Sequence, residues 1–176
     1  IPDHIRSFEK DAFREIYIQR PDGSKDWTNL DFIEELESPV PIKSYQPFNG
    51  VKKYYVHSFS KAALENLWRI FPNMAWFEIM GLEHSPDYVT QQGVLFTKDM
   101  KTLVIYPKHQ REEYTVPATV ETIQSGAFKD NTYLKIVHLS ESVRIIGSSA
   151  FERCNLEFIK LPKSVERIGS YAFFGT

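Results

Sequence analysis

The sequence contains a single cysteine, Cys154, and this scarcity excludes a framework of internal disulfides. One thiol fits either a reducing compartment or a secreted protein that packing alone holds together. No stretch approaches the roughly 18 consecutive apolar residues that span a bilayer, so we expect no membrane insertion. Neither sign of charge dominates, because 21 basic and 23 acidic residues leave a net charge of −2. We therefore expect no nucleic-acid partner.

Residue patterns typical of catalytic or metal sites are also missing. None of the five histidines lies three or four residues from another, the spacing typical of zinc ligands, and the glycines do not follow a phosphate-binding motif. Cys154 has no indicated partner base, so we interpret it as a packed structural thiol. The acidic doublets at residues 34–35 and 112–113 are typical of a solvated face and come without a glycosidase motif. We predict no catalytic residues, no cofactor and no metal.

The sequence does contain a motif that occurs three times near its C-terminal end. Residues 116–128, 139–151 and 161–173 share the same apolar positions, and their final phenylalanines are 23 and 22 residues apart. A period of that size is typical of stacked supersecondary units, not of one closed core. Residues 1–13 (IPDHIRSFEKDAF) agree with this motif in residue type at six spaced positions, so we interpret them as a degenerate copy.

Within each repeat, the residues predict two extended stretches and a tight corner. Residues 134–139 and 156–161 are typical of short strands with leucines facing the core and with Ile136 and Phe158 facing outward. A second extended stretch ends just before Gly147 or Gly169 in the later repeats, where a side chain would crowd the turn. The Ala-Phe pair then places a ring in the core. Strand spacing predicts that successive rings stack with a rise of roughly 4.8 Å per coil.

Two further elements are predicted upstream of the repeats. Residues 94–97 and 102–105 are apolar arms around a polar turn, which predicts a β-hairpin. Residues 60–71 predict a helix, because Ser60 is a suitable N-cap and apolar residues fall on one face before Pro72. The aromatic residues of this helix and of the strand after it fit a core better than a sugar-binding platform.

The repeated pattern is an apolar-proline pair, then S-V-x-x-I-G-x-x-A-F, then L-x-x-I-x-L-P, and it resembles the BspA-like leucine-rich repeat family of bacterial surface proteins. The resemblance covers residues 114–176, and residues 15–80 are similar to the segment that often closes an array in that family. It implies a right-handed leucine-rich repeat solenoid, mostly β with short parallel strands, a β-hairpin and one helix-containing terminal unit. We accordingly divide the chain into a degenerate repeat with a closing unit at 1–80, a linker at 81–87, and the hairpin with its repeats at 88–176.

The resemblance also implies a function. It predicts a non-enzymatic recognition or adhesion module, extracellular or on the cell surface, that binds a host or microbial protein through the solenoid surface. Two alternatives stay open: a structural spacer that projects another domain, and a carbohydrate-binding accessory domain or weak glycosidase with a glycan as its ligand. The candidate binding residues face outward on the predicted strands, although a neighbouring copy or the hairpin could equally cover their apolar pair. They are Lys135, Ile136, His138, Glu157, Phe158 and Lys160.

Both ends of the sequence fall within a repeat, and the sequence as given starts at Ile1 and shows no signal peptide. We therefore expect a processed or excised segment. Solenoids normally cap their terminal strand edges. The edges here are expected either to continue into further chain or to meet another copy in end-to-end self-association.

Overall fold

The computed structural model describes residues 18–19, 25–26, 35–38, 48–57, 59, 61–64, 67–80, 85–108 and 110–176. The chain forms two compact units, one of residues 1–74 and 79–86 and the other of residues 75–78 and 87–176. The predicted degenerate repeat at residues 1–13 lies outside the described residues, as does much of the predicted linker. The division into 1–80, 81–87 and 88–176 stays our proposal.

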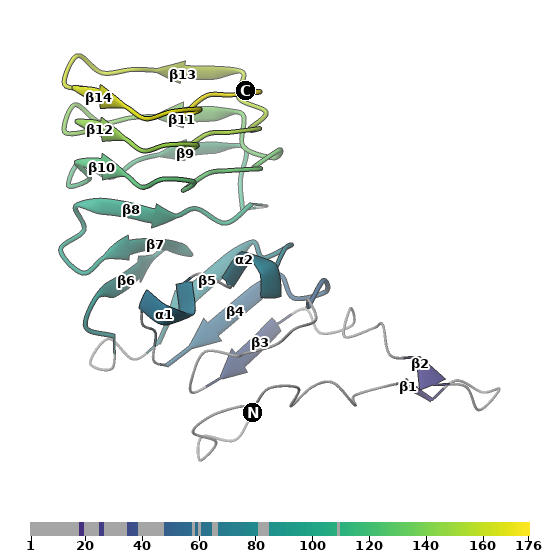
Figure 1. Cartoon of the computed structure of the whole chain (residues 1–176). Helices are drawn as coiled ribbons and strands as arrows, with labels where there is room; N and C mark the ends of the chain where they lie inside the picture. Colours follow the sequence, from purple (N-terminus) through teal and green to yellow (C-terminus); the bar gives the residue numbers. More distant parts are fainter. Residues whose placement is uncertain are drawn as a thin grey trace. The chain divides into compact units, whose positions relative to one another are not determined.

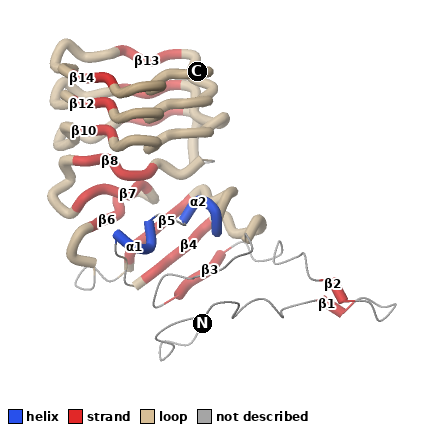
Figure 2. Tube along the Cα trace, viewed as in Figure 1, coloured by secondary structure: helices blue, strands red, loops and turns tan. Residues whose placement is uncertain are grey.

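The C-terminal part of the second unit is a β-solenoid, in which successive coils add short strands to two sheets (Figure 1). The first sheet has the order β14-β12-β10-β8-β7-β6, and the second has the order β13-β11-β9. The strands are β6 (Tyr88–Gln91), β7 (Val94–Thr97), β8 (Thr102–Ile105), β9 (Glu113–Thr115), β10 (Thr122–Ile123), β11 (Ile136–His138), β12 (Ile145–Ile146), β13 (Phe158–Lys160) and β14 (Arg167–Ile168). Coils pair in parallel from β8 onward in the first sheet and throughout the second. The predicted leucine-rich repeat solenoid with short parallel strands is confirmed, and most of each coil is loop (Figure 2).

The predicted β-hairpin is confirmed, since β7 and β8 pair antiparallel. Its turn is held by Asp99, whose carboxylate accepts hydrogen bonds from the Thr97 hydroxyl at 2.7 Å and from the Lys101 N–H at 3.0 Å. These bonds lower the pKa of Asp99. β6 adds a third antiparallel strand, which the sequence analysis did not predict. Because β8 then pairs in parallel with β10, the hairpin supplies the edge on which the coils stack.

A column of stacked aromatic rings runs through the core of the repeats. The ring centroids of Phe128 and Phe151 are 4.7 Å apart, and those of Phe151 and Phe173 are 5.3 Å apart. These spacings confirm the predicted rise of roughly 4.8 Å per coil. Tyr106, which follows β8, extends the column with its ring 5.0 Å from that of Phe128. Since each coil adds one large ring, burial of these rings couples the stability of each coil to that of its neighbours.

Gly147 and Asn131 serve the packing of neighbouring coils in two ways: the glycine allows a close approach, and the asparagine satisfies buried backbone groups. A Cβ on Gly147 would lie 2.8 Å from the Gln124 carbonyl carbon of the preceding coil, and still closer to the Ser125 nitrogen, so a larger residue requires the backbone to move. Asn131 is fully buried between β10 and β11. Its amide donates to the Pro107 carbonyl at 3.2 Å, and its side-chain oxygen accepts from the Leu134 N–H at 3.0 Å. The asparagine thus satisfies buried backbone groups at the corner of the coil.

The described part of the first 80 residues contains another sheet, in the order β3-β4-β5, and two one-turn helices. The elements are β1 (Ile18–Gln19), β2 (Lys25–Asp26), β3 (Glu35–Ser38), β4 (Lys53–Val56), α1 (Lys61–Leu64), α2 (Leu67–Ile70) and β5 (Trp76–Ile79). The Phe71 ring lies 4.3 Å from that of Tyr54, and both are buried. The single helix predicted over 60–71 is described as α1 and α2, with residues 60, 65 and 66 outside the described part. The helix-containing closing unit therefore stays a prediction.

Candidate binding surface

The six residues predicted to bind a partner lie in β11 and β13 and at the residue directly before each of these strands, on two neighbouring coils of the sheet β9-β11-β13. The register places Ile136 beside Phe158 and His138 beside Lys160. The two remaining residues directly precede these strands, and the Glu157 N–H donates to the Lys135 carbonyl at 2.8 Å. We call this surface the outer face. It consists of Lys135, Ile136, His138, Glu157, Phe158 and Lys160.

Alternation of side chains along β11 and β13 places Ile136, His138, Phe158 and Lys160 on the side of the sheet away from the core. In β11, Val137 is fully buried in the core, whereas Ile136 is half-buried and His138 is exposed. In β13, Ile159 packs against the core cluster, while Phe158 keeps 53% of its surface exposed. The outer face therefore presents an apolar ridge across two coils, formed by Ile136 and Phe158, on a sheet whose opposite side is fixed by the core.

The carboxylates around this ridge are paired with His138 and Lys135 of neighbouring coils. His138 Nε2 lies 2.8 Å from Glu113 Oε1 in β9. Lys135 Nζ lies 3.5 Å from a carboxylate oxygen of Glu112 and 3.9 Å from one of Glu157. Exposed pairs of this kind contribute only about 0–1 kcal/mol each to stability. Their main consequence is a defined order of charges along the rim of the outer face.

Two members of this charge pattern, Glu112 and Glu113, were assigned by the sequence analysis only to a solvated face. They belong to the coil of β9, which was not predicted as a strand. The register aligns Tyr114 with Val137, and Glu113 with Ile136. A usable signal was present, because Tyr114 precedes Val137 by one repeat length, but tyrosine stands where the later strands carry an aliphatic residue.

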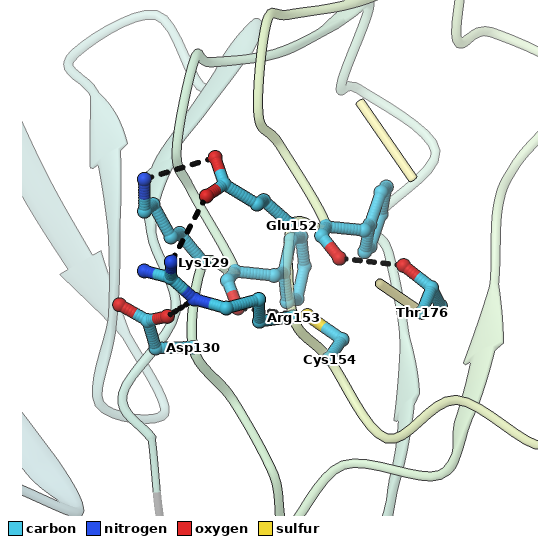
Figure 3. A network of polar contacts seen from close by, with 8 residues as sticks. Lys129, Asp130, Glu152, Arg153, Cys154 and Thr176 are labelled. Atoms are coloured by element: carbon cyan, nitrogen blue, oxygen red, sulfur yellow. Dashed lines mark hydrogen bonds and ion pairs between the residues drawn. The ribbon is translucent and has the colours of Figure 1, made fainter. Parts of the chain in front are cut away.

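A second polar network lies at the corner of the coils (Figure 3). Arg153 Nε donates to Asp130 Oδ1 at 2.6 Å, and Lys129 Nζ lies 2.9 Å from Glu152 Oε2. The hydrogen bond from Arg153 lowers the pKa of Asp130, and hydrogen bonds from Ser149 and then Lys129 lower the pKa of Glu152. Both ion pairs join one coil to the next, so we interpret this network as structural.

Residues 105–176 match the profile of the BspA type leucine rich repeat region, in six copies. This segment is a BspA-type leucine-rich repeat region. It includes the aromatic column from Tyr106 to Phe173 and the whole outer face.

Solved structures similar to the chain include three proteins of low sequence identity. The Pneumococcal vaccine antigen PcpA is 20% identical with a TM-score of 0.48, and the match covers 81% of this chain and 48% of that one. A leucine-rich repeat protein from Eubacterium ventriosum is 17% identical with a TM-score of 0.33, covering 80% and 64%. A leucine rich cell surface protein from Faecalibacterium prausnitzii is 14% identical with a TM-score of 0.40, covering 82% and 43%. The chain thus spans about half to two thirds of these structures, and no curated protein matches it.

The thiol within the BspA-type repeats is packed, as predicted. Cys154 is buried, and its Sγ donates a hydrogen bond to the Phe128 carbonyl at 2.9 Å. Burial raises the pKa of the Cys154 thiol to about 11, so the group is protonated at neutral pH and is a poor nucleophile. Among the residues that the structure describes, no cluster of His, Cys, Asp and Glu could hold a metal ion. Within the same residues, no helix has the length and apolarity needed to cross a membrane.

Proposed function

We propose that this chain is a non-enzymatic recognition module, secreted or on the cell surface, that binds protein partners through the outer face. The observation that supports this proposal is the apolar ridge, in which Phe158 is 53% exposed directly beside Ile136 on the next coil. An aromatic side chain that remains exposed next to a second apolar residue is typical of an interaction site. The resemblance to the BspA-like family implies the surface location and the protein partner.

The construction of the outer face also suits recognition. The ridge lies on strands whose inward residues, such as Val137, are buried in the core, so little ordering is needed when a partner binds. Polar pairs made by Lys135 and His138 lie beside it. An apolar centre with a polar rim is the usual composition of a protein–protein interface.

Binding of the full chain to immobilised extracellular matrix proteins and mucins tests the proposal. We expect saturable binding that Phe158→Ala weakens at least tenfold, as for a central aromatic residue of an interface. Tyr171→Ala is the matched control, because Tyr171 is 68% exposed at a corner of the coil and outside the outer face. Full retention of binding by Phe158→Ala, or an equal loss in the control, would contradict the proposal.

The same assay separates the alternative functions. A structural spacer would bind none of the immobilised proteins in a saturable manner. A carbohydrate-binding domain would bind mucin but lose that binding after the mucin is deglycosylated. A protein-binding module is expected to retain its partner after this treatment.

A further inference from the structure

The turn before β4 contains Asn49-Gly50, and Asn49 is the only one of the six asparagines that is followed by glycine. The Val51 N–H donates to the Phe48 carbonyl at 3.3 Å and closes the turn. Phe48 and Val51 are fully buried, whereas Asn49 is exposed. The turn thus presents an exposed carboxamide between two residues that the core holds in place.

The backbone nitrogen of Gly50 directly follows this carboxamide in the chain. In the part of the chain that the structure describes, the Gly50 N–H donates no hydrogen bond, so none has to break before the nitrogen reacts. Glycine also has no Cβ to hinder the approach of its nitrogen to a neighbouring carbonyl carbon. Gly50 therefore leaves its nitrogen accessible to Asn49 Cγ.

The reaction between these two groups needs only water. The Gly50 nitrogen gives its proton to solvent and attacks Asn49 Cγ, so that the N–Cγ bond forms and the Cγ–Nδ2 bond breaks. The side-chain nitrogen takes up a proton and leaves as ammonia, and a cyclic imide remains. Water then adds to one of the two imide carbonyl carbons and opens the ring to aspartate or isoaspartate. No atom is oxidised or reduced.

We propose that Asn49 is a site of spontaneous deamidation, and that isoaspartate at this position destabilises the core of the first unit. Isoaspartate carries the main chain through the former side chain, which lengthens the turn by one carbon atom. The Phe48 N–H donates to the Ile70 carbonyl at 2.6 Å, and its ring lies 5.7 Å from that of Phe71. The Asn49 carbonyl accepts from Asn73 Nδ2 at 2.9 Å. Because both sides of the turn are held in this way, a longer backbone has to displace Phe48 or break one of these hydrogen bonds.

Asn73 provides an internal control in the same unit. It is also exposed in a turn, but it is followed by Met74, whose N–H donates to the Phe71 carbonyl at 3.3 Å. Met74 is also fully buried. Attack on Asn73 would require this hydrogen bond to break and a buried residue to move. We therefore expect Asn73 to persist while Asn49 is converted.

Incubation of the full chain at mildly alkaline pH, followed by peptide mapping with mass spectrometry, tests the proposal. We expect progressive loss of Asn49 with release of ammonia, and isoaspartate among the products, detected by an isoaspartyl methyltransferase. Gly50→Ala places a Cβ beside the attacking nitrogen and should slow the loss severalfold. Hydrogen exchange at the amides of Phe48 and Val51 should become faster in the isoaspartate product. Asn49→Asp is the matched control, because it carries the same new charge on a normal backbone.

Each contrary outcome overturns a stated part of the inference. Retention of Asn49 in the folded chain, over a time in which the chain unfolded in guanidinium converts, would show that the turn protects it. Equal loss of Asn73 would contradict the role of Gly50. Unchanged exchange in the isoaspartate product, or the same acceleration in Asn49→Asp, would contradict the effect of the longer backbone. The proposed function is tested separately, because this turn belongs to the first unit and the outer face to the second.

Discussion

Replacement of Phe151 by alanine is expected to lower the free energy of unfolding of the repeats by about 3–5 kcal/mol. Phe151 is fully buried, and its ring is stacked on both sides, at 4.7 Å from Phe128 and 5.3 Å from Phe173. Truncation removes the transfer free energy of the ring and leaves a cavity in the column. Because two ring pairs worth about 0.5–1.5 kcal/mol each are also lost, we expect a value near the upper end of the range.

Two other Phe-to-Ala variants serve as controls. Phe173 is only partly buried and stacks on one described ring, so Phe173→Ala should cost roughly half as much as Phe151→Ala. Phe158→Ala makes the same chemical change on the outer face, where it should alter stability by less than about 0.5 kcal/mol. The three variants thus separate burial in the column from the chemistry of the substitution.

The assay is guanidinium unfolding combined with hydrogen exchange at amides of β11 and β12, so that the signal belongs to the repeats. A cost below about 1 kcal/mol for Phe151→Ala would refute the reasoning, because a fully buried ring in a stacked column cannot be removed so cheaply. Equal costs for Phe151→Ala and Phe158→Ala would refute it as well.

The remaining predictions concern other packed positions of the repeats and are checked by the same unfolding measurements unless stated. Gly147→Ala should cost about 1–3 kcal/mol through overpacking against the preceding coil, whereas Ser148→Ala, an exposed neighbour, should be neutral. Asn131→Ala should cost about 2–4 kcal/mol because buried backbone groups lose their partners, and Asn131→Asp should also destabilise because it cannot donate to the carbonyl. Cys154 should react with a thiol reagent at pH 7 only after unfolding, and rapid labelling of the native chain would count against its burial. Since folding raises the pKa of this thiol from 9.0 to about 11, its contribution to stability should be complete below pH 9 and decline as the pH rises toward 11.

The stacked core could be predicted from the sequence because a repeat of 22 or 23 residues returns the same residue type to the same place in each coil. Phe128, Phe151 and Phe173 therefore form the column that their spacing predicts. The sequence analysis did not predict that Tyr106 extends the column, because Tyr106 follows the hairpin and lies outside the repeated motif. β6 was missed although its pairing with β7 is local, because the two-residue turn between them is Gln92-Gly93, with positive φ at both residues, and glutamine stands where such turns usually carry Asn or Asp.

The sequence analysis predicted the apolar pair of the candidate site, but it did not predict all of the side-chain pairs around it. Ile136 and Phe158 occupy equivalent positions of successive repeats, so their pairing in the sheet follows from the period. The pairing of His138 with Glu113 depends on β9, whose strand the sequence did not predict. In the first 80 residues no clean repeat is present, and a helix of about one to three turns depends on tertiary packing rather than on its own propensity. The pattern over residues 60–71 therefore predicts a helix in this region without fixing its bounds.

The most direct test of the account is a measurement of nuclear Overhauser contacts between side chains of neighbouring coils. The account predicts contacts from the Phe151 ring to those of Phe128 and Phe173, and separate contacts between the Phe158 ring and Ile136. The central claim is that the stacked coils bury one row of phenylalanines and leave Phe158 and Ile136 on the outer face. Absence of the contacts between the core rings would contradict it. Contacts from Phe158 to the rings of the column would contradict it as well.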